Sequence, residues 1–336
     1  MKIFKSLIVL ITVLFLIVSC GKPTTPESLN PIGDGGYKII SHFQTSAFAQ
    51  DVLKKDDLCY IAQGEGGLMI ANVSDPYNPI SISTTSEGVR GYSTKIAMKD
   101  SVIYIGAGSF GVTAISVAIP EIPRVTASNL SMKPAKNLHV MGDYLFTAIS
   151  EQGVKIAKIS YPVQPDIRGG MSTSGYAQGI ANTADSNYLL VACGEMGLSI
   201  FNISDFQEGF ANYPLAGQGD TPGYAEAVTV MDNSSIALMA CGTSGLQIID
   251  FSDSTNVHIV GSYDGRGYAK ELVYNNNKVY LTAETGGLQI IDVTDITNPV
   301  LLGLVEMEYA LGLDIDDKYI YVADEDDGLI IVSMPD

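Results

Sequence analysis

The stretch GGLQIIDVTDITNP, residues 286–299, decides the fold, because variants of it recur along the chain. GGLMIANVSDPYNP stands at residues 66–79, and the shorter versions GLSIFNISDF and GLQIIDFSD stand at residues 197–206 and 245–253. In each copy a glycine suited to a tight turn precedes a short apolar run that is typical of a strand. The Asp and Pro residues that follow favour another turn. The recurrence indicates a repeat architecture.

The glycine that opens the apolar run occurs seven times, at intervals of 41 to 48 residues. These marker glycines are Gly67, Gly111, Gly153, Gly197, Gly245, Gly287 and Gly328. An aromatic residue, or once a proline, precedes each marker by 19 or 21 residues, namely Phe48, Tyr92, Pro134, Tyr176, Tyr224, Tyr268 and Tyr309. Each interval has room for four short strands, which is the sequence signature of a propeller blade.

The two ends of the chain complement each other. The last repeat provides three strands, at residues 311–316, 319–324 and 328–334, and lacks a fourth. The segment YKIISHF, residues 37–43, matches fourth strands such as VHIVGSY at residues 257–263. Pairing it with the last repeat would leave no exposed strand edge at the join. We therefore predict an all-β, seven-bladed β-propeller over residues 37–336, with four-stranded antiparallel blades and the N-terminal strand completing the last blade.

The run Leu288-Gln289-Ile290-Ile291-Asp292 carries a family resemblance. Units that read YAKELVY…KVYLTAETGGLQIIDVTDITNP resemble the LVIVD-repeat proteins over residues 37–336, most strongly in the first, fifth, sixth and seventh units. The second to fourth units depart from the pattern, since residues 117–120 and 159–162 lack the Asp of the connection and Pro134 replaces the aromatic. The resemblance implies a secreted or surface-attached β-propeller and no common reaction.

The first residues have a different character. Lys2 and Lys5 precede an apolar run at residues 7–18, and Ile17-Val18-Ser19-Cys20 resembles the lipobox of bacterial lipoproteins. We expect a signal peptide at residues 1–19, lipidation (palmitate) of Cys20, and a flexible Pro- and Gly-rich tether at residues 20–36. The protein would then lie at the bacterial cell envelope, periplasmic or surface-exposed, and contact the membrane only through its N-terminal lipid. An ordinary secretory signal and an uncleaved anchor are the alternatives.

Charge and motif content exclude several function classes. The net charge of −18 disfavours nucleic acid and anionic headgroups as partners, and leaves cationic groups, metal ions and neutral sugars open. The sequence GAGSFG at residues 106–111 lies in a turn between strands and opens no helix, so it is no phosphate site. The three histidines fall in different units, which argues against a histidine metal site. Cys59, Cys193 and Cys241 lie in apolar runs, and we expect them to be buried free thiols.

Candidate binding residues lie beside the marker glycines. Carboxylates recur in the preceding turns, as Glu65, Glu151, Glu195, Glu284, Glu325, Asp326 and Asp327, and we call these the rim carboxylates. The aromatic side chains Tyr92, Tyr176, Tyr224, Tyr268 and Tyr309, with Phe48, are expected on the same rim of the central channel. Such a surface suits sugars, a cationic peptide segment or Ca²⁺.

The same residues have a purely structural interpretation. The aromatics would be packing between blades, and the acids would pair with Arg90, Lys95, Lys136, Arg266 and Lys270. The acidic run at residues 324–327 is the best single candidate for a cation site. It does not have the ligand spacing of an EF-hand loop. No catalytic residue and no cofactor other than Ca²⁺ is therefore predicted.

Three function classes follow. We favour a binding or scaffolding module for an envelope protein or polysaccharide, without catalysis. A carbohydrate-active enzyme would need two converging rim carboxylates, one of them protonated near neutral pH. A structural assembly subunit without a small-molecule site would instead expose an apolar patch away from the channel.

Overall fold

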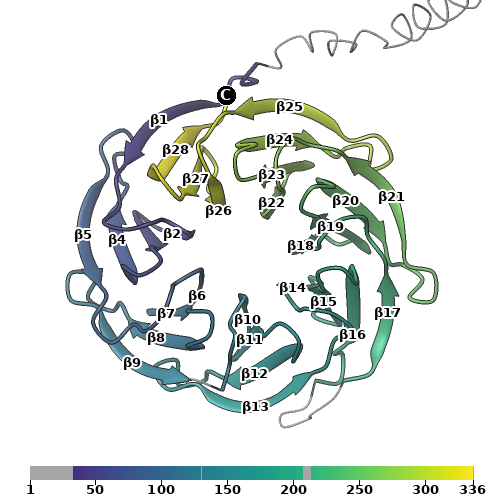
Figure 1. The fold of residues 1–336 in the computed structure, drawn as a ribbon, viewed down its shortest axis with the longest axis horizontal. Helices are drawn as coiled ribbons and strands as arrows, with labels where there is room; N and C mark the ends of the chain where they lie inside the picture. Colours follow the sequence, from purple (N-terminus) through teal and green to yellow (C-terminus); the bar gives the residue numbers. More distant parts are fainter. Residues whose placement is uncertain (1–32, 130, 207–212, 336) are drawn as a thin grey trace, which may run out of the picture. The chain divides into compact units, whose positions relative to one another are not determined.

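The computed structural model describes residues 33–129, 131–206 and 213–335. Every regular element in these ranges is a strand, and the strands form seven four-stranded antiparallel sheets around a central channel (Figure 1). The predicted seven-bladed β-propeller is confirmed. None of the elements in the described ranges is an apolar helix of membrane-spanning length. The predicted signal peptide and the lipidation residue Cys20 lie outside the described residues.

Within each blade, chain order runs from the innermost to the outermost strand. Blade 1 comprises β2 (Asp51–Lys55), β3 (Leu58–Ala62), β4 (Leu68–Asn72) and β5 (Ile80–Thr85); blade 2 comprises β6 (Lys95–Lys99), β7 (Val102–Gly106), β8 (Val112–Ser116) and β9 (Arg124–Asn129). Blade 3 comprises β10 (Asn137–Met141), β11 (Tyr144–Ala148), β12 (Val154–Lys158) and β13 (Asp166–Met171); blade 4 comprises β14 (Gly179–Asn182), β15 (Tyr188–Ala192), β16 (Leu198–Asn202) and β17 (Leu215–Gly219). Blade 5 comprises β18 (Ala227–Val230), β19 (Ile236–Ala240), β20 (Leu246–Asp250) and β21 (His258–Tyr263); blade 6 comprises β22 (Glu271–Asn275), β23 (Lys278–Thr282), β24 (Leu288–Asp292) and β25 (Val300–Val305). Blade 7 joins β26 (Ala310–Ile315), β27 (Tyr319–Asp324) and β28 (Gly328–Ser333) to β1 (Lys38–Phe43).

The N-terminal strand closes the ring as predicted. Strand β1 pairs antiparallel with β28, from Lys38 opposite Ser333 to Phe43 opposite Leu329. The compact unit begins at Asp34, where a turn forms through the hydrogen bond from the Tyr37 amide to the Asp34 carbonyl, 3.0 Å long. This turn packs so closely on blade 6 that a Cβ on Gly303 would lie 2.5 Å from the Asp34 carbonyl oxygen. The join therefore includes a loop contact as well as a strand pair.

The marker glycines occupy backbone conformations that other residues avoid. All seven have φ between +65° and +85°. A Cβ on Gly287 would also lie 2.3 Å from the carbonyl oxygen of Val305. The glycine is therefore required both for the turn and for the close approach of the outer strand.

Each outer strand contains a one-residue irregularity at the same place, as between Ile290 and Ile291 in the pairing of β24 with β25. Equivalent shifts occur in the other six blades. A bulge bends the strand and increases its twist. The sequence analysis did not predict these bulges.

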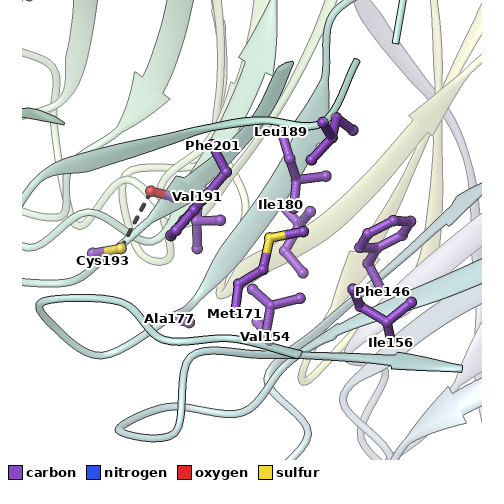
Figure 2. Packing of buried hydrophobic residues seen from close by; sticks show 12 residues of the cluster. Phe146, Val154, Ile156, Met171, Ala177, Ile180, Leu189, Val191, Cys193 and Phe201 are labelled. Carbon is purple, nitrogen blue, oxygen red and sulfur yellow. Dashed lines mark hydrogen bonds between the residues drawn. The ribbon is translucent and has the colours of Figure 1, made fainter. Parts of the chain in front are cut away.

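The core lies between neighbouring blades. Figure 2 shows the cluster between blades 3 and 4, where Phe146, Val154 and Met171 of one blade approach Ile180 and Leu189 of the next. All of these side chains are buried. Because each sheet is covered on both faces, its second and third strands are apolar in most positions. The three cysteines lie in these layers as buried free thiols, as predicted.

Candidate functional site

One face of the ring brings the predicted rim residues together. Isolated β-bridges connect the turn before a marker glycine to the loop that enters the next blade, as between Gly64 and Ser93 and between Gly194 and Ala225. Six blade junctions carry such a bridge. The loop that carries the repeat aromatic therefore lies beside the turn of the preceding blade, and this turn is acidic in blades 1, 3, 4 and 6.

The tyrosine rings have a packing role. Tyr92 covers Gly64 so closely that a Cβ on that glycine would lie 2.7 Å from the ring, and Tyr268 covers Gly242 in the same way at 2.8 Å. This supports the structural interpretation for the rings. Their hydroxyl groups have a second role, because they form hydrogen bonds with polar side chains.

Three hydroxyl contacts define that network. The Tyr92 hydroxyl donates to Glu325 Oε1 at 3.3 Å, and the Tyr268 hydroxyl donates to Glu226 Oε1 at 3.0 Å. Tyr224 accepts a hydrogen bond of 3.0 Å from the Gln178 side chain. Burial, together with the charge and hydrogen bonding of Glu284, raises the pKa of Tyr309 to about 12. These phenols therefore remain protonated donors at neutral pH.

Among the described residues, the rim carboxylates have no lysine or arginine partner. Glu65, Glu151, Glu195 and Asp326 are exposed, and the other three are half-buried. Within the described ranges, no lysine or arginine nitrogen lies within 4 Å of any of the seven, while Asp327 Oδ2 lies 3.6 Å from His42 Nδ1. The expected pairing with Arg90, Lys95, Lys136, Arg266 and Lys270 is wrong for all seven acids. Lys95 and Lys270 bind inner-strand carboxylates instead.

The acidic run at residues 324–327 divides into different roles. Asp324 is fully buried, and its carboxylate accepts hydrogen bonds from the amides of Tyr309 (2.8 Å), Asp326 (3.1 Å) and Asp327 (3.0 Å). It is therefore a turn residue. In the part of the chain that the structure describes, no group of three or more His, Cys, Asp and Glu side chains is arranged to hold a metal ion.

A buried ion cluster crosses the channel. Lys95 Nζ of β6 contacts Glu271 Oε2 of β22 and lies 3.9 Å from Asp51 Oδ1 of β2. The Asp51 carboxylate also accepts the Ile96 amide at 2.9 Å. Blades 2 and 6 are not neighbours in the ring, so the Lys95–Glu271 pair spans the channel rather than a blade interface.

For both Asp51 and Lys95, burial and the opposite charge nearby shift the pKa in opposite directions. Burial raises the pKa of Asp51 to about 6, although the charge of Lys95 opposes the increase. Burial alone would lower the pKa of Lys95, but the charges of Asp51 and Glu271 outweigh it and raise that pKa. Lys95 therefore stays charged, and Asp51 titrates nearer to neutrality than an ordinary aspartate.

Lys95 and Glu271 of the cluster line two small cavities. One, of about 240 Å³, lies at the mouth and is lined by Gln50, Lys136, Gln178 and Glu226 as well as Lys95 and Glu271. The other, of about 170 Å³, is lined by Asp51, Leu313 and Asp314 and shares Lys95 and Glu271. At the mouth, Lys270 Nζ lies 3.0 Å from Glu226 Oε1. The sequence analysis missed this cluster.

The remaining candidates are more dispersed. Glu195 lies close enough to Tyr224 to contribute to the rise of its pKa, after burial and Glu226. The side chains of Glu151 and Tyr176 make no hydrogen bond within the described ranges, and Tyr176 is 43 % exposed. The structure therefore brings Tyr92 and Glu325 into contact, places Tyr176 near Tyr224, and leaves Glu151 as an exposed turn residue.

Exposed apolar side chains also occur away from the rim. The connections between the third and fourth strands expose Ile119 and Ile122 in blade 2, and Tyr161 and Val163 in blade 3. Tyr161 is 81 % exposed. These connections lead to the outermost strands, away from the inner strands that line the channel (Figure 1).

Comparison with known proteins identifies the repeat. The family model described as "LVIVD repeat" matches residues 48–85, 134–173, 222–265, 266–306 and 309–334, more than half of the chain. No curated protein matches. The solved WD40 β-propeller domain of Doa1 is 10% identical, with a TM-score of 0.70 over 89% of this chain and 97% of that one. The computationally designed Ika8 protein is 11% identical, with a TM-score of 0.60 over 85% and 83%. At these identities the likeness concerns the fold alone.

Proposed function

The chain belongs to the family of LVIVD-repeat proteins, and from its channel mouth we propose that it is a binding module whose working surface is the rim. One observation carries this proposal. Within the described residues the rim carboxylates have no lysine or arginine partner, and several of them stand beside aromatic rings on one face of a closed ring. Aromatic residues are enriched at binding interfaces, and carboxylates without counter-charges attract cationic partners. The partner is a protein or polysaccharide of the cell envelope.

Attachment to the envelope through Cys20 belongs to the proposal. Its support is the lipobox-like sequence at residues 17–20 behind a basic and apolar leader. A cell culture fed an alkyne analogue of palmitate should label the natural chain and leave a Cys20→Ala variant unlabelled. Equal labelling of both would remove this part of the proposal.

Site-specific photo-crosslinking in cells tests the working surface. A photoreactive residue in place of Phe110 or Met196, both exposed in rim turns, should capture the partner. The same residue in place of Tyr161 tests the outer connections. Capture at the rim positions supports the proposal. Polysaccharide partners are tested on a glycan array, where Glu284→Gln and Glu325→Gln should reduce binding. The absence of crosslinks at positions 110 and 196, together with the absence of binding on the glycan array, would overturn the proposal.

A structural assembly subunit is the second candidate. The exposed Ile119, Ile122, Tyr161 and Val163 favour it, because apolar side chains away from the channel suit a protein interface. Crosslinks confined to position 161 would establish this alternative.

Carbohydrate catalysis has less support. In the channel, Asp51 and Glu271 converge, but Lys95 binds between them.

A further inference from the structure

A pocket of about 550 Å³ opens on the rim where three blades meet. The loop from β1 to β2 contributes residues 45–48, and the turn of blade 1 contributes Glu65. Tyr92 comes from the loop into blade 2, while Glu325 and Asp326 come from the turn of blade 7. We call this the blade 1 pocket. It is more than twice as large as the cavity at the channel mouth.

Phe48 makes this pocket different from the rest of the rim. Its repeat position holds tyrosine in five of the seven units, and the hydroxyls of Tyr92 and Tyr268 donate to carboxylates. Phenylalanine has no hydroxyl to donate. Its ring is 53 % exposed, against 36 % for Tyr92 and 43 % for Tyr176. The pocket therefore has an apolar aromatic wall that is open to a ligand.

The opposite wall is negatively charged. Glu325 Oε1 accepts from Tyr92 and, at 3.4 Å, from the Gln50 side chain, whereas its Oε2 has no hydrogen-bond partner within the described ranges. Glu65 and Asp326 make no ion pair in the same part of the chain. Burial, and then the charges of Glu325 and Glu65, raise the pKa of Tyr92, so both carboxylates act on this one corner of the pocket.

We propose that the blade 1 pocket receives an arginine side chain from a basic segment of the protein partner, with the guanidinium against Phe48 and its N–H groups on the pocket carboxylates. This inference rests on the proposed function and specifies the partner. A planar guanidinium stacks on an aromatic face while its edge donates to carboxylates, which the compact lysine ammonium cannot do. A neutral sugar would use the ring and leave the carboxylates without a counter-charge. The net charge of −18 would also attract a basic segment.

The test uses the full chain in detergent micelles and three peptides, acetyl-Gly-Xaa-Gly-amide with Xaa arginine, lysine or citrulline. Citrulline keeps the shape of arginine and lacks the charge. Saturation-transfer NMR titrations give the dissociation constants. We expect the citrulline peptide to bind at least about tenfold more weakly than the arginine peptide, with the lysine peptide between them, because charged hydrogen bonds are about twice as strong as neutral ones. Phe48→Ala and Glu325→Gln should each weaken arginine binding about tenfold, which corresponds to about 1.4 kcal/mol.

Blade 4 supplies controls on the same rim, with Tyr176 at the repeat position of Phe48 and Glu195 at that of Glu65. Tyr176→Ala and Glu195→Gln remove an aromatic and a carboxylate from the same rim outside the pocket, and should change binding less than twofold. Equal weakening by these controls would show attraction by net charge only and would overturn the proposal. Equal binding of the citrulline peptide, or no binding of the arginine peptide, would also overturn it. Rim crosslinks that persist without arginine binding would preserve the proposed function while rejecting the arginine assignment.

Discussion

Replacing Lys95 with methionine tests whether the buried ion cluster stabilises the closed ring. Methionine keeps most of the apolar stem and removes the charge. The side chains of Lys95, Glu271 and Asp51 are 18%, 18% and 11% exposed, so the variant leaves two carboxylates in a poorly solvated channel. Removing one partner of a buried pair costs about 3–5 kcal/mol. Stabilities of folded domains are about 5–15 kcal/mol, so this loss is large.

Urea unfolding at pH 7, followed by circular dichroism, measures this cost. With a slope of about 3 kcal/mol/M, the midpoint should fall by about 1 M or more. Lys136→Met is the matched control, because Lys136 lines the same mouth cavity and makes no ion pair within the described residues. It should change stability by less than about 0.5 kcal/mol.

The pH dependence provides the sharper check. Asp51 already has its pKa raised to about 6, and loss of the Lys95 charge raises that pKa further. At pH 5 the proton on Asp51 removes part of the uncompensated charge, so the penalty of the Lys95 variant should be smaller at pH 5 than at pH 7. Equal midpoints for the Lys95 and Lys136 variants, or a Lys95 penalty independent of pH, would refute the reasoning.

Three further predictions concern buried groups. The pKa of Asp51 rises from 3.8 to about 6 on folding, so the stability contributed by its protonated form is complete below about pH 4 and is lost as the pH rises through about 6. Between pH 4.5 and pH 7 this is a decrease of about 2 kcal/mol in the free energy of unfolding, which Asp51→Asn should remove in urea titrations; the same decrease in the variant would contradict the prediction. Tyr37 is only 2% exposed at the ring join, so Tyr37→Ala should lower the free energy of unfolding by about 3–5 kcal/mol and lower the melting temperature. A melting temperature equal to that of the natural chain would show that the join contributes little to stability. Burial raises the pKa of the thiols of Cys59, Cys193 and Cys241. Iodoacetamide should therefore alkylate them in urea and leave them unmodified in the native protein, as measured by mass spectrometry. Rapid labelling of the native protein would show that these thiols are accessible.

The fold could be predicted because its determinants are local and repeated. A glycine at positive φ, an apolar run and a turn recur at a nearly constant interval, and each copy specifies the same blade. This holds even for residues 86–133 and 174–221, which the family model does not match but which form β6–β9 and β14–β17. The ring closure followed from counting strands. The turn at residues 34–37 was not predicted, because its partner, Gly303, lies at the other end of the chain.

The channel and the pocket could not be predicted in the same way, because the ring brings together residues that are far apart in sequence. Lys95 and Glu271 are 176 positions apart and come from blades that are not neighbours. Their repeat position nevertheless carries a signal, since the seven units place there Asp51, Lys95, Asn137, Gly179, Ala227, Glu271 and Gly312. Three charged residues at a position where the other units have glycine, alanine or asparagine cannot serve the common blade structure. Phe48 also departs from the repeat, because its position is tyrosine in five of the seven units. In a repeat protein, residues that match the repeat specify packing, so the departures are where this chain's own binding chemistry should be sought.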